Sequence, residues 1–580
     1  MITSVKYRLF YNGESIMKMT GAKMVTQSLK EERVDTVFGY PGGAIMNVYD
    51  EIYKQTDFQH ILTRHEQAAI HAAEGYAKAT GRVGVAIVTS GPGFTNAVTG
   101  LADAYMDSIP LVVISGQVPS NIIGTDGFQE IDAVGISRPC TKHNYLVNDI
   151  KDLPRIIKEA FHIASTGRPG PVHVDIPKDI TAELGNFDYP DKVELPTYKP
   201  TVNYNKKQLK RAMQALAKAK KPLLYVGGGA IASNCAHDIR EFAKKTNIPA
   251  VETLMARGVM GHDNPLLVGM LGMHGEYSAN MAAHETDLLI SLGARFDDRV
   301  TGRLDEFAKK AKVIHIDIDP ATIAKLVETN FPIVGDLQVT VRGMIDSLEE
   351  LEMNDYTNWV ALLHEYREKQ PLRFIDSDTK IKPQWPIRRV GEILGDRAVI
   401  STDVGQHQMW TAQFYPFSFA RQFNTSGGLG TMGFGLPGAM GVAKAVPEKV
   451  SINFTGDGSI LMNIQELMTC VENKLPVINI ILNNNYLGMV RQWQTMFYDN
   501  RISETDLSAQ PDFPKLAEAF GANGYRVETK EEFDKALKDA VKAKKPALIE
   551  VIVDRNEEVL PMVPNGHALN EMTLIGDNNE

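Results

Sequence analysis

Two polar loops in the last third of the chain carry oxygen-bearing side chains suited to a magnesium ion. Asp457 lies in the segment Gly456-Asp457-Gly458-Ser459, and Asn484 ends the pair Asn483-Asn484. Carboxylate and amide oxygens are hard ligands, which together with water and phosphate oxygens complete the octahedron that Mg²⁺ requires. The glycines let the backbone approach a phosphate, and a helix that begins at Ser459 favours anions at its N-terminus. The pattern predicts a magnesium–diphosphate site, with an ordinary Gly-Asp-Gly turn as the alternative.

A strand–helix–strand unit is needed to position these two loops. The apolar run 450–454 predicts a buried strand before the first loop, and a second strand ends at Asn484. Between them, four apolar residues recur at the spacing of one helix face: Ile464, Leu467, Met468 and Val471. Both loops then fall at the carboxyl ends of neighbouring parallel strands, where open α/β sheets bind ligands. The arrangement resembles the diphosphate-anchoring motif of thiamin-diphosphate enzymes.

A third candidate, Glu66, begins an alanine-rich helix predicted after Arg64-His65. A glutamate at this place is usually a surface charge favoured by the helix dipole. Thiamin diphosphate, however, requires one carboxyl group that hydrogen-bonds to its aminopyrimidine ring and so assists loss of the proton from the reactive carbon. Because the same chain contains the diphosphate motif, we favour the second interpretation and predict that Glu66 activates the cofactor.

The overall composition is that of a soluble globular protein, with 43% hydrophobic and 23% charged residues. The 580 residues exceed what a single core can bury, so we expect three domains. The net charge of −10, without a concentrated basic stretch, argues against nucleic acid as a partner. Since no run approaches the ~20 apolar residues of a membrane helix, no membrane partner is expected either.

The cysteines and the N-terminal residues point to the cytoplasm. Cys140, Cys235 and Cys470 are far apart and not at the spacing of metal ligands, so we expect them to pack in the core of a protein from a reducing compartment. The residues up to 15 lack the apolar core of a signal peptide. Met17 or Met19 is an alternative start, because helical sequence follows directly. We therefore predict a cytoplasmic location.

Strand and helix patterns alternate along the chain, which predicts an α/β fold made of three doubly wound parallel sheets. We expect an N-terminal domain at 18–185, a central domain at 202–353, a C-terminal domain at 384–556 and a tail or lid at 557–580. The intervening segments 186–201 and 354–386 contain several prolines and are predicted to be linkers. In the central domain, Gly227-Gly228-Gly229 favours a dinucleotide turn and tight strand-to-helix packing equally.

Four motifs of the first domain resemble a known family: Tyr40-Pro41-Gly42-Gly43-Ala44, Arg64-His65-Glu66-Gln67-Ala68-Ala69, Thr89-Ser90-Gly91-Pro92-Gly93 and Gly124-Thr125-Asp126-Gly127-Phe128-Gln129-Glu130. They resemble the large catalytic subunit of acetohydroxyacid synthase, also called acetolactate synthase, and the resemblance covers nearly the whole chain. It implies decarboxylation of pyruvate and condensation of the remaining two-carbon unit with pyruvate or 2-oxobutanoate. The products would be 2-acetolactate or 2-aceto-2-hydroxybutanoate, in the first common step of branched-chain amino-acid biosynthesis. A homodimer or homotetramer and a regulatory small subunit are also implied.

The resemblance assigns residues to the reaction and to the first cofactor. The reacting groups and the substrates fall to seven residues: Gly43, Glu66, Gln129 and Lys178, with Phe128, Arg299 and Trp493 on the substrate side. For magnesium it adds the backbone carbonyl of Tyr486 to Asp457 and Asn484. For thiamin diphosphate it implies Glu66 and the following residues: Gln406, His407, Gly430, Thr431, Met432, Gly456, Asp457, Gly458, Ser459, Asn484, Leu487, Gly488 and Met489.

A second cofactor, FAD, is implied by the segment Gly293-Ala294-Arg295-Phe296-Asp297-Asp298-Arg299. This segment resembles the one that distinguishes FAD-containing members of the family from their FAD-free relatives. Because the net reaction has no redox step, FAD is expected to be structural or vestigial. The resemblance assigns it to these residues: Arg168, Gly228, Thr253, Leu254, Leu271, Gly272, Met273, His274, Gly293, Arg295, Asp297, Asp317, Ile318, Asp336 and Leu337.

Two other functions remain open from the sequence. A redox-active relative similar to pyruvate oxidase would pass electrons to FAD and form acetate or peroxide, but the segment 293–299 and Trp493 argue against it. A regulatory paralogue would bind the cofactor without turnover, but the presence of Glu66, Asp457 and Asn484 argues against that function.

Overall fold

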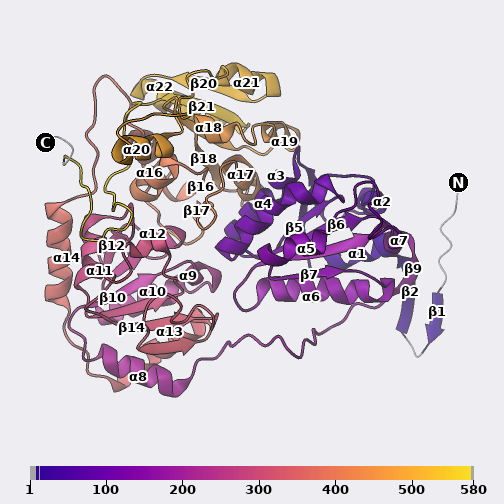
Figure 1. The fold of residues 1–580 in the computed structure, drawn as a ribbon, viewed down its shortest axis with the longest axis horizontal. Helices are drawn as coiled ribbons and strands as arrows, with labels where there is room; N and C mark the ends of the chain where they lie inside the picture. Colours follow the sequence, from indigo (N-terminus) through magenta and orange to yellow (C-terminus); the bar gives the residue numbers. More distant parts are fainter. Residues whose placement is uncertain (1–7, 12–13, 577–580) are drawn as a thin grey trace. The chain divides into compact units, whose positions relative to one another are not determined.

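The computed structural model describes residues 8–11 and 14–576 and contains three six-stranded parallel sheets (Figure 1). By their internal contacts the residues form two compact units. The first unit comprises Met1–Lys199, Gly428–Pro447 and Asn463–Leu475, and the second comprises Pro200–Gly427, Glu448–Met462 and Pro476–Glu580. The three sheets with their helices confirm the predicted α/β fold, while the domain boundaries given above stay predictions.

The first unit is built on one parallel sheet. Its strands lie in the order β4 (Gln59–Leu62), β3 (Thr36–Gly39), β5 (Gly84–Val88), β6 (Leu111–Gln117), β8 (Pro171–Pro177) and β7 (His143–Leu146). Helices α1 (Gly21–Glu31) and α6 (Leu153–Ser165) share a core with Val172 and Val174 of β8. On the other face, Phe94 of α4 (Pro92–Asp107) stacks on His173, with 4.4 Å between the ring centroids. Successive residues of β8 therefore meet two different helix layers, as a doubly wound sheet requires.

Further elements complete the first unit. A small antiparallel sheet is formed by β1 (Arg8–Tyr11), β2 (Glu14–Thr20) and β9 (Leu184–Phe187). The remaining helices of residues 8–11 and 14–199 are α2 (Met46–Lys54), α3 (Glu66–Thr80), α5 (Ala133–Ser137) and α7 (Lys178–Ala182). The later segments add α17 (Gly435–Ala445) and α19 (Glu466–Glu472).

Helix α3, which Glu66 begins, packs very closely against α17. A Cβ on Gly75 would lie 2.1 Å from the carbonyl oxygen of Gly438, and a Cβ on Gly441 would lie 2.0 Å from the carbonyl oxygen of Ala72. No side chain can be accommodated at such distances, so only glycine fits at either position. The small residues of α3 are thus explained by backbone-to-backbone helix packing, and this packing holds the helix that positions Glu66.

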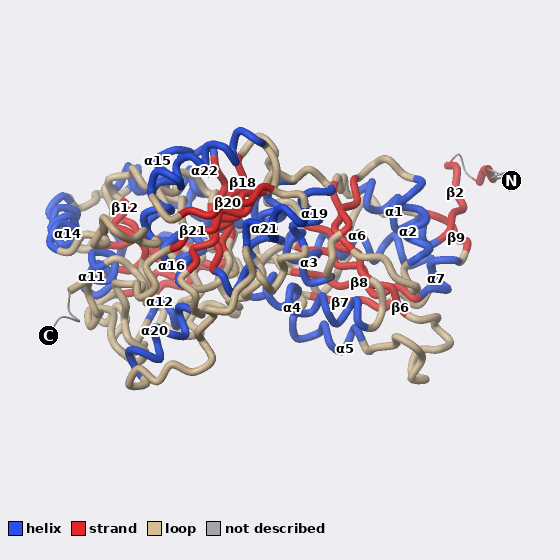
Figure 2. The backbone as a smooth tube through the Cα atoms, turned by 90° about the horizontal axis from the view of Figure 1, so that it is seen from above, coloured by secondary structure: helices blue, strands red, loops and turns tan. Residues whose placement is uncertain are grey.

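The second unit contains two parallel sheets. The middle sheet has the order β12 (Leu267–Met270), β11 (Ala250–Glu252), β10 (Pro222–Val226), β13 (Leu288–Leu292), β14 (Lys312–Asp317) and β15 (Phe331–Val334). The third sheet has the order β17 (Phe423–Asn424), β16 (Ala398–Thr402), β18 (Val450–Gly456), β19 (Ile478–Asn483), β21 (Ala547–Ile552) and β20 (Asn523–Val527). Figure 2 shows these strands in red among the blue helices that accompany them.

Longer helices of the second unit connect these strands. In the middle part they are α8 (Lys206–Leu216), α10 (Ala236–Thr246), α11 (Tyr277–Glu285), α13 (Leu337–Ser347) and α14 (Thr357–Lys369). Around the third sheet they are α15 (Gln384–Leu394), α16 (Gln406–Phe414), α20 (Gly488–Phe497), α21 (Phe513–Phe520) and α22 (Lys530–Ala543). Three single-turn helices are α9 (Gly229–Ala232), α12 (Asp298–Thr301) and α18 (Asp457–Ile460).

The order of the strands distinguishes the middle sheet from the other two. With strands numbered along the chain within each sheet, the first and third sheets both have the order 2-1-3-4-6-5, and the middle sheet has 3-2-1-4-5-6. The latter is the order of dinucleotide-binding sheets. In each case the order reverses beside strand 1, which is β3, β10 or β16, and ligands of open α/β sheets bind at that point.

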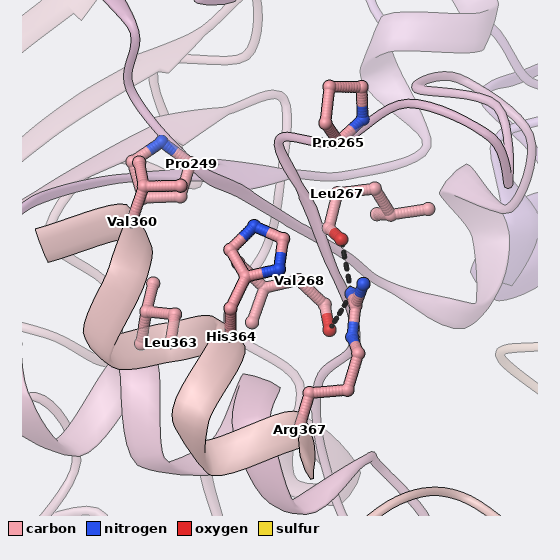
Figure 3. Close-up of a pocket in the computed structure, with 8 residues that line it drawn as sticks. All are labelled: Pro249, Pro265, Leu267, Val268, Val360, Leu363, His364 and Arg367. Carbon is pink, nitrogen blue, oxygen red and sulfur yellow. Dashed lines mark hydrogen bonds between the residues drawn. The ribbon is translucent and has the colours of Figure 1, made fainter. Parts of the chain in front are cut away.

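The predicted linker at 354–386 is wrong where α14 lies. Trp359 and Leu363 of this helix are buried, and Trp359 Nε1 donates to the Pro222 carbonyl at 2.9 Å. Figure 3 shows a recess beside α14, where the Arg367 guanidinium donates to two backbone carbonyls of β12; the recess is lined by Pro249, Pro265, Leu267, Val268, Val360, Leu363, His364 and Arg367. Apolar residues do recur at helical spacing in α14, at Trp359, Leu363 and Tyr366, and the linker was predicted instead because Pro371, Pro383 and Pro386 follow in the same segment. The segment 186–201 is irregular, as predicted, apart from its first two residues, which end β9.

The helix predicted from the spacing of Ile464, Leu467, Met468 and Val471 is wrong in extent and in its buried face. Helix α19 begins only at Glu466, and its buried residues are Glu466, Leu467, Thr469 and Cys470. The Glu466 carboxylate accepts from the backbone N–H of Arg64 at 2.9 Å and from the Thr469 hydroxyl at 2.7 Å. Since these polar groups are paired inside the first unit, they can be buried in place of the apolar stripe.

Two simpler expectations were tested by the structure. All three cysteines are buried and unpaired, which confirms their place in the core. Within the described ranges, no helix is long and apolar enough to cross a membrane.

Candidate active site

Glu66 is a buried carboxylate at the first position of α3. His65 caps the helix, its Nδ1 accepting the Gln67 backbone N–H at 3.1 Å. One oxygen of Glu66, Oε2, accepts from the Asn96 side-chain amide at 2.9 Å. The other, Oε1, faces Gly93, where a Cβ would lie only 3.4 Å away. Glu66 is therefore held through one oxygen, while a glycine leaves room beside the other for the polar edge of a ligand.

The other residues predicted in the first unit gather at the carboxyl edge of the same sheet. Gly43 follows β3, and a Cβ added there would meet no atom within 4 Å. Gln129, in the loop after β6, has a positive φ of 59° and lies against Gly91. Lys178 follows β8 and is exposed, and the Phe128 side chain is 89% exposed. The sheet thus brings these side chains to one edge and leaves their outer faces open.

In the third sheet, Asp457 directly follows β18 and is buried. Its Oδ2 accepts a hydrogen bond from the Gln510 side chain. Burial raises the pKa of the Asp457 carboxyl to about 7. A buried carboxyl whose charged form is disfavoured gains most from a cation placed beside it.

Asn484 stands at the end of the neighbouring strand, β19, which pairs with β18. Its Oδ1 accepts the Tyr486 backbone N–H at 3.0 Å, and its Nδ2 donates to Gln406 Oε1 at 3.2 Å. The side-chain oxygens of Asp457 and Asn484 are the donor set that Mg²⁺ prefers. The parallel pairing of β18 and β19 confirms the prediction that these two loops follow neighbouring parallel strands.

Groups suited to phosphate surround these ligands in the third sheet. His407 is buried, its Nε2 has no hydrogen-bond partner among the described residues, and burial lowers its pKa to about 3. Helix α20 begins at Gly488, where a Cβ would lie 2.1 Å from Gln406 Oε1 and would displace that side-chain amide. Ser459 Oγ accepts the Gly456 N–H at 3.2 Å, Leu487 is the residue before α20, and Met489 packs at the sheet core. An unpaired buried imidazole and a helix N-terminus fit the diphosphate of a cofactor.

The segment with Gly430, Thr431 and Met432 belongs to the first unit by its contacts. Its start is fixed by the Gly428 N–H, which donates to Asp107 Oδ1 at 2.7 Å. Gly430 has a positive φ of 73°, and Met432 is half-buried. The side chain of Met432 therefore has an open side, as its predicted place beside a cofactor requires.

The residues predicted to bind FAD mostly follow strands of the middle sheet. They come after β10 (Gly228), β11 (Thr253, Leu254), β12 (Leu271, Gly272, Met273, His274), β13 (Gly293, Arg295, Asp297), β14 (Asp317 at its end, Ile318) and β15 (Asp336, Leu337). Parallel strands end at one edge, so these residues share the carboxyl edge of the sheet. Thr253 Oγ1 is buried without a hydrogen-bond partner among the described residues. The edge and this unpaired hydroxyl fit a dinucleotide such as FAD.

Some predicted FAD residues have structural partners of their own. Gly227 and Gly229 pack against Gly293 so closely that a Cβ on either would lie under 3.0 Å from its backbone, which supports the packing interpretation of the glycine cluster. Asp336 caps α13 by accepting the Val339 N–H at 3.0 Å, and Arg295 pairs with Asp297. Arg168, in the first unit, donates from Nε to Ser108 Oγ at 2.7 Å.

The two predicted substrate residues of the second unit lie at its surface. Trp493, on α20, is 37% exposed. Arg299, on α12, is exposed, and its Nε lies 3.9 Å from an Asp298 carboxylate oxygen. Both side chains are therefore accessible to a small molecule.

Sequence reasoning missed two amides, Asn96 and Gln510, and the contacts that the predicted Gln406 makes with other amides. Asn96 binds Glu66, Gln510 binds Asp457, and Gln406, predicted only for the cofactor, binds both Asn484 and Gln492. Gln406 and Gln492 lie in the same segments as predicted residues, but Asn96 and Gln510 have no motif that marks them. Their partners are far away along the chain, so no local spacing could have revealed these pairs.

The class of protein follows from models of protein families, which match the chain in three places. The matches are the N-terminal TPP-binding domain of thiamine pyrophosphate enzymes at residues 19–136, their central domain at 209–344 and their C-terminal TPP-binding domain at 403–551. The chain is therefore a thiamine pyrophosphate enzyme.

Similar proteins define the family within this class. The chain is 48% identical to the acetolactate synthase large subunit of Haemophilus influenzae, over 96% of the chain and 98% of that protein. It is 46% identical to the acetolactate synthase isozyme 3 large subunit of Escherichia coli, with the same coverage. A probable acetolactate synthase large subunit of Methanocaldococcus jannaschii is 46% identical over 95% of the chain and 94% of that protein. The chain belongs to the acetolactate synthase large-subunit family, which confirms the resemblance found in the sequence.

Proposed function

We propose that this chain catalyses the acetolactate synthase reaction on pyruvate, with a second pyruvate or 2-oxobutanoate as acceptor. The observation that carries the proposal is the identity of 46–48% to acetolactate synthase large subunits over nearly the whole length of the chain. The products are 2-acetolactate and 2-aceto-2-hydroxybutanoate, in the first common step of branched-chain amino-acid biosynthesis.

Glu66 is the group that we propose to act on the cofactor. Thiamin diphosphate, when bound, supplies the ring that accepts the electron pair left when CO2 departs. Glu66 would hold the aminopyrimidine edge by a hydrogen bond through its Oε1, the oxygen that faces Gly93. Asn96 would keep the carboxyl group in place through Oε2. Burial of the side chain excludes water that would compete for this hydrogen bond.

Asp457, Asn484 and the Tyr486 carbonyl would hold Mg²⁺, and His407 with the start of α20 would bind the diphosphate. This proposal is supported by the buried Asp457 carboxyl with its raised pKa and by the unpaired His407 Nε2. Gly430, Thr431 and Met432 are also proposed as cofactor-binding residues, since the Met432 side chain keeps an open side.

FAD would be held at the carboxyl edge of the middle sheet. The support is the strand order 3-2-1-4-5-6 and the placement of the predicted residues directly after the strands. Since the proposed net reaction transfers no electrons to an acceptor, FAD would have a structural role.

Contact with the substrates is proposed for six residues: Gly43, Phe128, Gln129, Lys178, Arg299 and Trp493. Arg299 offers a planar guanidinium that suits the carboxylate of a 2-oxo acid. We also propose assembly as a homodimer or homotetramer together with a regulatory small subunit, since the relatives are named as large subunits.

The test is colorimetric measurement of acetolactate formed from pyruvate, with thiamin diphosphate, Mg²⁺ and FAD omitted in turn. Acetolactate should form only when thiamin diphosphate and Mg²⁺ are both present. If acetate or peroxide formed in place of acetolactate, the chain would be a redox-active relative. No turnover of pyruvate with all three cofactors present would contradict the proposed function altogether.

A further inference from the structure

We infer that Gln492 is a positioning residue which, through Gln406, fixes the side-chain amide of Asn484 with its oxygen towards the cation. The inference rests on the proposed magnesium site and deepens it. It concerns a chain of hydrogen-bonded amides that begins in the C-terminal tail and ends at Asn484. All of its members lie in the second unit.

Gln492 lies on α20, is completely buried and pairs with the backbone of one tail residue. Its Oε1 accepts the Val559 N–H at 2.9 Å, and its Nε2 donates to the Val559 carbonyl at 3.2 Å. A backbone N–H can only donate and a carbonyl can only accept. Val559 therefore determines which end of the Gln492 amide is oxygen.

Gln406 is the next member of the chain and is also buried. Its Nε2 donates to Gln492 Oε1 at 2.9 Å and to the Glu557 carbonyl at 3.2 Å. Both of these acceptors require the NH₂ end of the Gln406 amide. The Oε1 of Gln406 is thereby turned to Asn484, whose Nδ2 donates to it at 3.2 Å.

The consequence appears at Asn484, where the Oδ1 end also accepts the Tyr486 N–H at 3.0 Å. An amide oxygen has two lone pairs, so the second is available to a cation. A reversed Asn484 would present an NH₂ group that no cation binds. It would also set oxygen against Gln406 Oε1 and NH₂ against the Tyr486 N–H, and buried polar groups left unpaired in this way are costly. Gln406 and Gln492 thus exclude the reversed orientation.

Gln413 provides a matched control because it anchors the same tail without joining the chain of amides. It is buried on α16 and donates to the carbonyls of Leu560 at 3.3 Å and His274 at 3.0 Å. Neither hydrogen bond leads to Asn484. If the tail acted only through its general stability, Gln413→Leu and Gln492→Leu would have the same effect on the cation.

The experiment compares these variants in the full chain with saturating thiamin diphosphate. Bound Mn²⁺ is measured by electron paramagnetic resonance and bound Mg²⁺ by calorimetry, so that the readout is separate from activity. Gln492→Leu should raise the Kd of both cations ~10-fold, which corresponds to ~1.4 kcal/mol. Gln413→Leu should leave both Kd values within about twofold of the parent, even if it lowers Tm as much as Gln492→Leu does.

A second variant keeps the test valid if Gln492→Leu fails to fold. Gln492→Glu can still accept from Val559 and Gln406 but cannot donate to the Val559 carbonyl. It should raise the Kd by more than twofold and less than Gln492→Leu does. Unchanged Kd values in both Gln492 variants, or an equal rise in Gln413→Leu, would overturn the inference.

Asn484→Ala separates this inference from the proposed function on which it rests. If Asn484→Ala weakens cation binding and the Gln492 variants do not, only the role of Gln492 is wrong. If Asn484→Ala leaves the Kd unchanged, both the proposed magnesium site and the role of Gln492 are wrong.

Discussion

The first and third sheets have the same strand order, 2-1-3-4-6-5, and each presents a buried carboxyl group near its carboxyl edge. In the first sheet Glu66 begins the helix after strand 2 and is bound by Asn96. In the third sheet Asp457 follows strand 3 and is bound by Gln510, with a pKa raised to about 7 by burial. The shared topology thus determines the edge at which polar groups gather, while the loops determine which group stands after which strand.

The two carboxyl groups would also differ in what they do. We expect Glu66 to affect turnover more than binding, because we propose that it contacts the part of the cofactor where a proton moves. We expect Asp457 to affect binding, because we propose that it holds the cation on the diphosphate. If substitutions of Glu66 and of Asp457 changed turnover and cofactor binding in the same proportion, the two carboxyl groups would not differ in role.

The largest effect is expected from Asp457→Ala, which removes the charged ligand of the proposed cation. Since changes to groups behind a metal ligand already cost 10–100-fold in affinity, loss of the ligand itself should weaken cofactor binding by more than ~100-fold. Calorimetry of thiamin diphosphate binding in the presence of Mg²⁺ measures this. An affinity equal to that of the parent would show that Asp457 does not hold the cation.

Glu66→Gln is expected to lower kcat by ~100-fold, the size of a general acid–base contribution, because the amide cannot share a proton with the cofactor. Binding of thiamin diphosphate should stay close to that of the parent. Steady-state acetolactate formation and calorimetry on the same preparation test both statements. Turnover near the parent value would exclude Glu66 from the reaction. A loss of thiamin diphosphate binding would show that Glu66, like Asp457, acts in cofactor binding.

The raised pKa of Asp457 predicts that cation binding at the third sheet depends on pH. Below about 7 the carboxyl keeps its proton in the folded protein, and this proton must leave before a cation binds. The Kd for Mg²⁺ should therefore fall ~10-fold for each unit of rising pH up to about 7, and then level off. Calorimetry between pH 5 and pH 8 measures it, with Asp457→Asn as the control in which this dependence disappears. A flat Kd in the parent would contradict the raised pKa.

The smallest effect is expected at Trp493, on the helix that follows strand 4 of the third sheet. Phe128 lies in the loop after strand 4 of the first sheet, so the two aromatic residues occupy matching places. One methylene in a closed pocket is worth about 1–3 kcal/mol, and Trp493 is 37% exposed. Trp493→Leu should lower the ratio of aceto-hydroxybutanoate to acetolactate by only a few fold. Product analysis at a fixed mixture of the two 2-oxo acids tests this, with Phe128→Leu as the comparison; an unchanged ratio would remove Trp493 from acceptor selection.

Local motifs were sufficient to predict where three candidate site residues lie in the fold. Glu66, Asp457 and Asn484 each stand at a helix start or a strand end with polar or glycine neighbours, and the structure places them there. The α/β class followed from alternating apolar runs, because buried parallel strands such as β5 and β10 are apolar along nearly their whole length.

What the sequence could not predict depends on contacts between distant residues. Asn96 and Gln510 bind the two carboxyl groups from other elements, and their spacing from Glu66 and Asp457 carries no periodic signal. Helix α14 was missed because the prolines that follow it outweighed its apolar spacing. Helix α19 was misjudged because Glu466 is buried through hydrogen bonds rather than by apolar contact, and its partner Arg64 lies far along the chain.

The close packing of α3 on α17 also constrains when the protein can fold during its synthesis. Helix α3 ends at Thr80, whereas α17 starts at Gly435, so the ribosome must add several hundred residues before the partner helix exists. At ~5–20 residues per second this interval lasts tens of seconds. Throughout it the small-residue face of α3 lacks its α17 partner, although the last strand of the first sheet, β8, ends at Pro177, long before α17. The nascent N-terminal part is therefore exposed to chaperones and to premature association with neighbouring chains until the C-terminal third emerges.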